Sequence, residues 1–233
     1  FKNSKVNITS ITKDKKEAVI SVSSDKNPGA FYIFNSETRK LKQYGKSKNI
    51  DTNKMATVKG IKVKARDGLD LYGYLTLPKG TSGKVPLVVK VHGGPHGPRD
   101  YWGWDDENQL LAANGYGVLQ INFRGSGGYG RVFEEIGHRK WGAEMQDDIT
   151  DATLWAIDQG VTDKESICIY GGSYGGYASA MAVVREPDLY KCAIPYVGVY
   201  SLPVMKVAGD IPRSRSGKVF LDKVLGENEE DLL

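Results

Sequence analysis

A serine set among four glycines is the strongest chemical signal in the sequence. The stretch ICIYGGSYGGYASAM, residues 167–181, places Ser173 directly after a run of β-branched residues and before a run of helix formers. A hydroxyl on a sharp strand-to-helix turn is the arrangement of a nucleophile that attacks a carbonyl carbon. Gly171 and Gly175 leave room for such a turn, because a Cβ there would meet neighbouring backbone. The alternative is a glycine-rich turn that uses a small polar residue, but the context favours a nucleophile.

Backbone N–H groups could stabilise the negative charge that such an attack creates. The helix expected after the serine begins at Tyr174, and a helix N-terminus presents N–H groups without intrahelical acceptors. The stretch VHGGPHGP, residues 91–98, follows an earlier apolar strand. Hydrolases with this strand-turn-helix pattern take a second N–H donor from a loop of this H-G-G type. We therefore predict an oxyanion hole formed by the N–H groups of Tyr174 and Gly94.

A metal site is not expected in the same loop. His92 and His96 have the i, i+4 spacing of zinc ligands on a helix, but Gly93, Gly94 and Pro95 between them are incompatible with a regular helix. No glutamate follows His92. We expect His92 to shape the turn, and we predict no metal.

A dinucleotide site is not expected either. Three glycines of FRGSGGYG form a G-x-G-x-x-G pattern after a strand: Gly125, Gly127 and Gly130. The sequence that follows is interrupted by glycines and provides no second apolar strand ending in an acid. We predict a flexible-backbone loop near the active face, a structural Arg124 and no cofactor.

Composition excludes other classes of function. The net charge is +4, and the lysines of the first 64 residues are scattered without an arginine stripe, so no nucleic-acid partner is expected. No apolar stretch is long enough for a membrane span.

Cys168 and Cys192 lie in apolar runs and predict two buried free thiols rather than a disulfide or a metal pair. The chain begins at Phe1 without a signal-peptide pattern, which suggests a piece of a longer polypeptide and leaves cytoplasm and periplasm open.

The first 48 residues predict an antiparallel sheet of four short strands. The strand-like runs KVNITSIT, EAVISVSS, AFYIFNS and RKLKQYG are separated by polar turn clusters. Such a unit has the size of one β-propeller blade. A polar connector follows it, and we expect residues 1–48 to be a separate domain.

From about Thr57 the pattern changes to strands that alternate with helices. We expect a hairpin at Asp67–Gly68 and apolar, buried strands in PLVVKVHGG and GVLQINFRG. Further strands are expected in ESICIYGG and CAIPYVGVY, and helices in DENQLLAANGY, QDDITDATLWAIDQG and YASAMAVVRE. This order predicts an α/β fold over residues 49–233, with a mostly parallel sheet covered by helices on both faces.

With its motifs in this order, the chain resembles the prolyl oligopeptidase family of serine peptidases. The motifs are VHGGPHGP, QINFRGSGGYG, DDITDATLWAI and YGGSYGGYASAM. The His-Gly-Gly-Pro sequence is most similar to the acylaminoacyl-peptidase branch. The resemblance covers roughly residues 57–200 and implies an α/β-hydrolase domain joined to a β-propeller, with short peptides as substrates. By position it implies Ser173 as nucleophile and the N–H groups of Tyr174 and Gly94 as the oxyanion hole. Residues 1–48 would then be the end of the propeller.

The chain departs from the family in one respect. The family's triad runs serine, aspartate, histidine, yet the three histidines, His92, His96 and His138, all precede Ser173. We nominate none of the later aspartates, which are Asp188, Asp210, Asp222 and Asp231. The expectation is truncation at both ends, with the triad acid and base outside the chain and the fragment itself inactive. A carboxylesterase-type hydrolase and a non-catalytic relative stay as alternatives; substrate preference and homo-oligomerisation of the full-length enzyme stay open.

Overall fold

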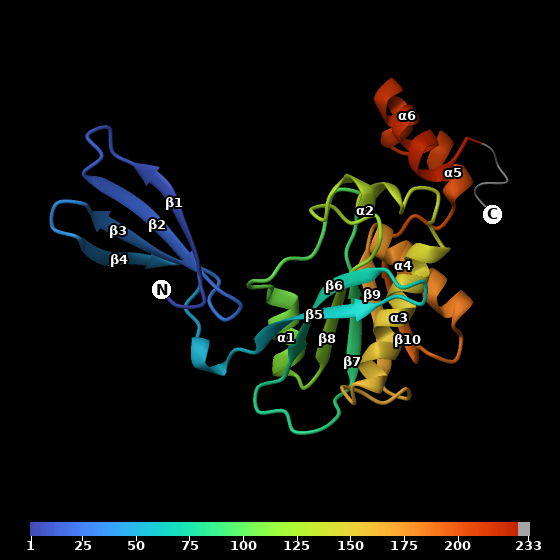
Figure 1. The fold of residues 1–233 in the computed structure, drawn as a ribbon, viewed down its shortest axis with the longest axis horizontal. Coiled ribbons are helices and arrows are strands. Elements are labelled where there is room, and N and C mark those ends of the chain that lie inside the picture. The colour runs from blue at the N-terminus through green and yellow to red at the C-terminus, as the bar shows by residue number, and fades with distance from the viewer. Residues whose placement is uncertain (228–233) are drawn as a thin grey trace. The chain divides into compact units, whose positions relative to one another are not determined.

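Two separate β-sheets form the framework of the computed structural model, which describes residues 1–227 (Figure 1). The backbone divides into two compact units. The first comprises residues 1–59, 76–81 and 101–116, and the second comprises residues 60–75, 82–100 and those from 117 onward.

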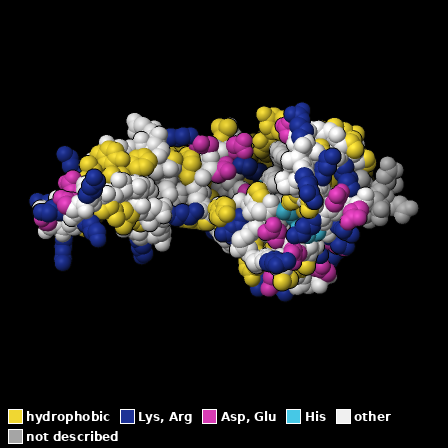
Figure 2. Space-filling model, turned by 90° about the horizontal axis from the view of Figure 1, so that it is seen from above, with side chains coloured by type: hydrophobic (Ala, Val, Ile, Leu, Met, Phe, Trp, Pro, Cys, Tyr) yellow, Lys and Arg dark blue, Asp and Glu magenta, His cyan; other side chains and the backbone are white. Residues whose placement is uncertain are grey.

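The first unit contains the four-stranded antiparallel sheet that the turn clusters predict. Its strands are β1 (Lys5–Ile11), β2 (Glu17–Ser23), β3 (Ala30–Asn35) and β4 (Lys40–Lys46), paired in the order β1-β2-β3-β4. Val22 and Ala30 are buried, but large apolar side chains such as Ile8 and Ile11 are exposed. Figure 2 shows hydrophobic side chains gathered among lysines on this sheet. A sheet of this size leaves apolar surface unburied, as expected for four strands alone.

The same unit holds a short 3₁₀ turn (Thr52–Lys54) and helix α1 (Asp106–Ala113). The side chain of Asp105 caps α1 by accepting the N–H of Asn108. The helix ends near Gly115, which takes φ +89° as the sequence predicts for a glycine after a helix end.

A six-stranded sheet carries the predicted α/β pattern. Its strands are β5 (Thr57–Lys64), β6 (Asp70–Leu77), β7 (Leu87–Val91), β8 (Gly117–Asn122), β9 (Ile167–Gly172) and β10 (Cys192–Tyr196). They are arranged in the order β10-β9-β7-β8-β6-β5, and β7 pairs in parallel with both β8 and β9. Val89, Leu119 and Ile169 are fully buried in these central strands, which explains their continuous apolar sequences.

Two helices pack against the central strands of this sheet. They are α3 (Glu144–Asp158), which contacts β8, and α4 (Tyr174–Arg185), which contacts β7, β9 and β10; the two also contact each other (Figure 1). The remaining elements are α2 (Arg131–Glu135), α5 (Leu202–Val207), a 3₁₀ turn (Ile211–Arg213) and α6 (Arg215–Leu225). In residues 1–227, no helix combines the length and the hydropathy that crossing a membrane requires.

The prediction of two free thiols is wrong, because Cys168 and Cys192 form a disulfide. They are directly paired residues of the parallel strands β9 and β10, with Cα atoms 4.7 Å apart. This separation lies within the range that a disulfide spans. Two cysteines in separate apolar runs carry no sequence signal for pairing, since their adjacency depends on which strands become neighbours.

Reduction of this disulfide is expected to lower the free energy of unfolding by about 3 kcal/mol. The bond closes a loop of 24 residues, and the chain-entropy model assigns roughly this stabilisation to a loop of that length. Urea unfolding of the 233-residue chain with and without dithiothreitol measures the difference. The Cys168→Ala/Cys192→Ala double variant is the control and should not respond to reductant. Equal unfolding midpoints for the oxidised and reduced chain would contradict the prediction.

Candidate active site

Ser173 lies at the tip of β9, where the strand turns into α4. Its backbone has φ +57° and ψ −120°, a conformation that non-glycine residues rarely adopt. The turn is held by its neighbours: Ser173 N–H donates to Tyr196 O at 3.0 Å, and Ser173 O accepts the N–H of Gly176 at 2.9 Å. Ser173 is exposed. The geometry predicted for this turn is therefore present, and strain of this kind is concentrated at functional sites.

The glycines around Ser173 are required by close backbone approach. A Cβ on Gly171 or Gly175 would lie 2.6 Å or 2.2 Å from Val91 O, at the end of β7. A Cβ on Gly176 would lie 2.6 Å from Tyr196 O. Gly172 differs, because its nearest neighbour would be at an ordinary 3.5 Å. Three of the four glycines thus let the turn pack directly against β7 and β10.

The Gly175→Ala substitution is expected to disrupt the turn, whereas Gly172→Ala is its matched control. The new methyl group of Gly175→Ala would overlap the Val91 carbonyl, which cannot move without shifting β7. Overpacking of this kind costs about 1–3 kcal/mol. Thermal unfolding of the 233-residue chain measures the effect. We expect the unfolding midpoint to fall for Gly175→Ala and to stay near wild type for Gly172→Ala; equal midpoints for the two variants would refute the packing argument.

The loop after β7 lies against this turn. A Cβ on Gly93 would be 3.1 Å from Gly172 O and 3.4 Å from Ser173 Cβ. Gly94 is exposed and has φ +121°, which favours glycine. Within residues 1–227, no hydrogen bond engages the N–H of Gly94 or of Tyr174. The structure therefore brings the predicted loop and the predicted serine together.

The side chain of Tyr174 is completely enclosed, unlike the serine that precedes it. It is 1% exposed and packs edge-on to Trp141, with ring centroids 4.6 Å apart. Burial raises the pKa of its phenol well above the ordinary value. Tyr174 therefore contributes a neutral side chain to the core and leaves its backbone N–H for the site.

Within residues 1–227, no hydrogen bond joins any of the three histidines to Ser173. Both ring nitrogens of His92 are engaged, with Gly93 O at 2.8 Å and Ser126 Oγ at 2.8 Å. His96 accepts the Trp141 indole N–H at 3.3 Å and lies edge-on to His138. Burial lowers the pKa of His92 and of His96 to about 4. The expectation that His92 shapes the turn agrees with these contacts.

Arg124 has the structural role that the sequence predicts. Its guanidinium forms a bidentate ion pair with Asp148, with donor–acceptor distances of 2.9 Å and 2.7 Å, and its backbone N–H also donates to Asp148 at 2.7 Å. The carboxylate of Asp148 is fully buried, and burial raises its pKa to about 6. A second ion pair joins Arg124 to Asp67 at 2.8 Å. These bonds connect the end of β8 to α3 and to the turn at residue 67.

The four aspartates that follow Ser173 in the sequence have no assigned role in catalysis. Asp188 and Asp210 are exposed, Asp222 pairs with Lys206 at 3.0 Å, and Asp231 lies outside the described residues. Across residues 1–227, no three side chains of metal-binding type converge.

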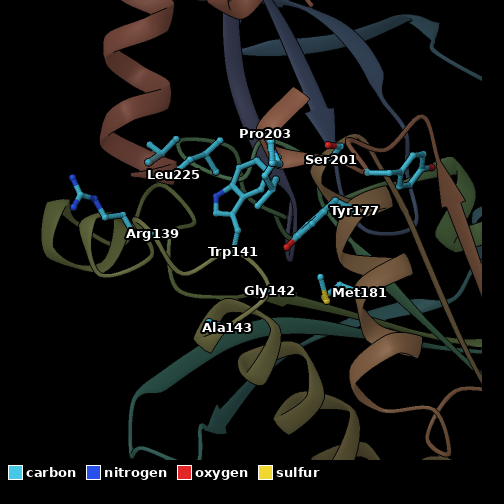
Figure 3. A pocket seen from close by; sticks show the side chains of 12 residues that line it. Arg139, Trp141, Gly142, Ala143, Tyr177, Met181, Ser201, Pro203 and Leu225 are labelled. Atoms are coloured by element: carbon cyan, nitrogen blue, oxygen red, sulfur yellow. The ribbon is translucent and has the colours of Figure 1, made fainter. Parts of the chain in front are cut away.

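A pocket of about 450 Å³ lies beside α4 (Figure 3). Trp141, Tyr177 and Met181 line it together with residues of α5 and α6. Tyr177 follows Ser173 by one helical turn, and burial raises the pKa of its phenol to about 12. Ser173 is not among the residues that line this pocket. The pocket therefore adjoins the helix that carries the serine rather than the serine itself.

Sequence reasoning missed two residues that hold the site. Tyr196 O fixes the Ser173 N–H, and the buried Ser126 Oγ contacts His92 Nε2. Tyr196 acts through its backbone, so its side-chain type carries no signal. Ser126 lies in the FRGSGGYG loop. The recognisable pattern of that loop is formed by its glycines, so the sequence gives no separate signal for the serine.

A mostly parallel sheet with a serine on the turn from a central strand to a helix defines an α/β hydrolase. The solved acylaminoacyl peptidase of Pyrococcus horikoshii is similar, with a TM-score of 0.77 and 26% identity over 97% of this chain and 36% of that one. Residues 102–217 match the model of the prolyl oligopeptidase family. The chain belongs to the prolyl oligopeptidase family.

Curated relatives agree with this assignment. Dipeptidyl aminopeptidase BIII of Pseudoxanthomonas mexicana is 36% identical over 206 residues, which are 84% of this chain and 30% of that protein. Dipeptidyl peptidase family member 6 of Caenorhabditis elegans is 31% identical over 229 residues, again 84% of this chain and 30% of that protein. The chain thus spans less than a third of the length of these two relatives.

Proposed function

We propose that the full-length gene product, meaning the complete polypeptide that the gene encodes, is a serine peptidase that hydrolyses short peptides. The observation that carries the proposal is the exposed Ser173 on a strained strand-to-helix turn, near the N–H groups of Tyr174 and Gly94, which have no acceptor within residues 1–227. The relatives support peptide substrates, since they bear the names dipeptidyl aminopeptidase and acylaminoacyl peptidase.

The proposed reaction passes through an acyl-enzyme. Ser173 Oγ attacks the carbonyl carbon of the scissile peptide, and a general base takes the hydroxyl proton. The N–H groups of Tyr174 and Gly94 bind the oxyanion of the tetrahedral intermediate. The C–N bond then breaks, and the amine leaves with the proton. Water then attacks the ester, and the base transfers one proton of that water to Ser173 Oγ as the C–O bond breaks. The product is released as a carboxylic acid, which ionises at pH 7.

We propose that the base and its acid partner come from residues outside 1–233. Support comes from the greater length of the relatives and from the contacts of His92, which leave neither ring nitrogen for Ser173. In the same proposal, residues 1–48 are the end of a β-propeller-like domain, and residues 49–233 belong to the hydrolase domain. The exposed apolar side chains of β1 favour a packing partner for that sheet.

Labelling and turnover of the full-length gene product test the proposal. A fluorophosphonate should label the wild-type protein on Ser173 and should not label the Ser173→Ala variant. Anilides of short peptides, with free and with acetylated amino termini, should be hydrolysed by the wild-type protein and not by the Ser173→Ala variant. Hydrolysis of a p-nitrophenyl ester without hydrolysis of any peptide anilide would favour a carboxylesterase, because the turn and the loop serve ester cleavage equally well. Absence of labelling would favour a non-catalytic relative.

A further inference from the structure

Val197, directly after β10, has a backbone conformation that its side chain disfavours. Its φ is +43°, in the left-handed region, where a β-branched residue is a genuine outlier. The side chain is 67% exposed, so burial of its methyl groups does not offset the cost. Strain of this kind persists only where the surrounding structure enforces it, and it is concentrated at functional sites. The strain at Val197 therefore has a structural cause, and its place in the fold indicates a role.

The conformation of Val197 helps to set the direction of the Tyr196 carbonyl. A peptide unit is planar, so the peptide between Tyr196 and Val197 turns as a whole, through ψ of the first residue and φ of the second. This carbonyl accepts the Ser173 N–H at 3.0 Å. A return of Val197 to negative φ, with the flanking Cα atoms in place, would rotate the carbonyl away from Ser173. The strained backbone thus accompanies the hydrogen bond that holds the nucleophile turn.

The hydroxyl of Tyr200 closes the loop that contains Val197. It donates to Pro195 O at 3.1 Å and accepts the N–H of Gly198 at 3.0 Å. The two partners lie on either side of Val197 in the sequence, one within β10 and one in the loop after it. The phenol therefore links the chain before Val197 to the chain after it and restricts the residue between them.

Close packing joins this loop to the first turn of α4. A Cβ on Gly198 would lie 2.5 Å from Tyr200 Cε1 and 2.8 Å from Gly176 C. Likewise, a Cβ on Gly176 would lie 2.8 Å from Gly198 Cα. The ring of Tyr200 and the helix that follows Ser173 both approach Gly198 too closely for a side chain. The loop after β10 is thus connected directly to the nucleophile turn.

We propose that Tyr200 and Val197 are positioning residues for the nucleophile: the Tyr200 hydroxyl holds Val197 at positive φ, and the carbonyl direction that results at Tyr196 holds the Ser173 backbone. The inference rests on the proposed function, because it assigns roles within the same site. Without the hydroxyl, Val197 is free to take negative φ, and the Ser173 N–H loses its acceptor. Ser173 Oγ is then presented to the substrate for a smaller fraction of the time.

Removal of one oxygen atom tests the proposal. In the full-length gene product, Tyr200→Phe should lower kcat and the rate of fluorophosphonate labelling on Ser173 by about 10-fold, because the hydroxyl makes two hydrogen bonds of modest net strength. Tyr116→Phe is the matched control. Tyr116 is also exposed, and its hydroxyl has no hydrogen-bond partner within residues 1–227, so this variant should keep both wild-type values.

A second substitution at Val197 separates positioning from general stability. Glycine populates positive and negative φ about equally, so Tyr200→Phe/Val197→Gly should return kcat to within about twofold of wild type. Isoleucine is β-branched like valine, so Tyr200→Phe/Val197→Ile should recover none of the loss. A merely structural role of the hydroxyl predicts no recovery in either variant, because glycine adds no contact and increases the freedom of the unfolded chain.

Hydrogen exchange of the Ser173 amide follows the same hydrogen bond without any need for activity. Mass spectrometry of the full-length gene product should find exchange at Ser173 about 10-fold faster in Tyr200→Phe, because the bond to Tyr196 O opens more often. Exchange at Ile169, in the buried middle of β9, should be unchanged. Glycine at position 197 should restore the protection of Ser173, and isoleucine should not.

Wild-type exchange at Ser173 in folded Tyr200→Phe would overturn the inference, and so would wild-type kcat of that variant. Equal recovery with glycine and with isoleucine at position 197, or faster exchange at Ser173 and Ile169 alike, would also overturn it, because both indicate a general effect on stability. If Tyr200→Phe does not fold, Val197→Pro decides, since proline fixes φ at about −65° and should expose the Ser173 amide to exchange. Failure of the proposed function looks different: exchange would follow the prediction, but the wild-type protein would be inactive or Ser173→Ala would keep the activity.

Discussion

Residues 1–233 alone are expected to hydrolyse peptide and ester substrates no faster than their Ser173→Ala variant, whereas the full-length gene product is expected to be active. The reason is the general base. Removal of the histidine of a serine triad costs on the order of 10⁶ in kcat and leaves the residual catalysis of the oxyanion hole and binding. The difference between the two proteins should therefore approach that factor.

His92 directly precedes Gly93, the residue that lies against Ser173. The contacts of its ring nevertheless exclude His92 as a substitute base. A base needs a ring nitrogen within about 3.2 Å of the hydroxyl that it deprotonates. Both nitrogens of His92 are committed, to Gly93 O and to Ser126 Oγ. Its pKa of about 4 also makes it a weak base at pH 7. His96 is bonded to Trp141 and has an equally low pKa.

Burst and steady-state assays with peptide anilides and p-nitrophenyl esters measure this prediction. Each protein is compared with its own Ser173→Ala variant, and circular dichroism confirms that the isolated chain is folded. Serine-dependent turnover by folded residues 1–233 would show that a base exists within them. The proposal of an external histidine would then be wrong.

Replacement of Arg124 by Met is expected to destabilise the chain by about 3–5 kcal/mol, the usual cost of leaving one member of a buried ion pair without its partner. The carboxylate of Asp148 is fully buried, and the guanidinium provides two of its hydrogen bonds. The pair with exposed Asp67 contributes little to the loss, because solvent screens exposed ion pairs. Urea unfolding at pH 7 measures the change.

The pH dependence of this loss has a definite sign. Without Arg124, the folded state raises the pKa of Asp148 further, since burial then acts without its main opposing charge. Folded Arg124→Met binds a proton at a pH where the unfolded chain does not, so its stability rises as the pH falls from 7 towards about 4. The deficit relative to wild type should therefore shrink at pH 5.

A matched control uses an exposed ion pair. Lys191 pairs with Glu165 at 2.7 Å, and both side chains are well exposed. Lys191→Met should change the free energy of unfolding by less than about 1 kcal/mol. The double variant Arg124→Met/Asp148→Leu should recover part of the loss, because it removes the unpaired charge. Similar costs for Arg124→Met and Lys191→Met would show that the buried pair is not important for stability.

The sequence alone predicts the nucleophile turn because its determinants are local. Ser173, the glycines around it, the apolar run of β9 and the helix formers of α4 are contiguous, and each favours the observed backbone. The antiparallel meander of residues 1–48 and the alternation of strands and helices are predictable for the same reason. Their periodicities and turn residues lie within a few positions of one another. The full extent of the first compact unit is not predictable in this way, because the unit also includes residues 76–81 and 101–116, which are distant in sequence from its sheet.

Tertiary structure decides the contacts that complete the site. Ser173 and Tyr196 O, His92 and Ser126, and Cys168 and Cys192 are pairs of residues distant in sequence, joined across loops or across neighbouring strands. Which residues meet depends on the order β10-β9-β7-β8 and on the register of each strand pair. A shift of one residue in that register would separate Cys168 from Cys192, because alternate side chains of a strand point to opposite faces of the sheet. Residue type predicts the turn that presents Ser173; strand order and register determine what holds it.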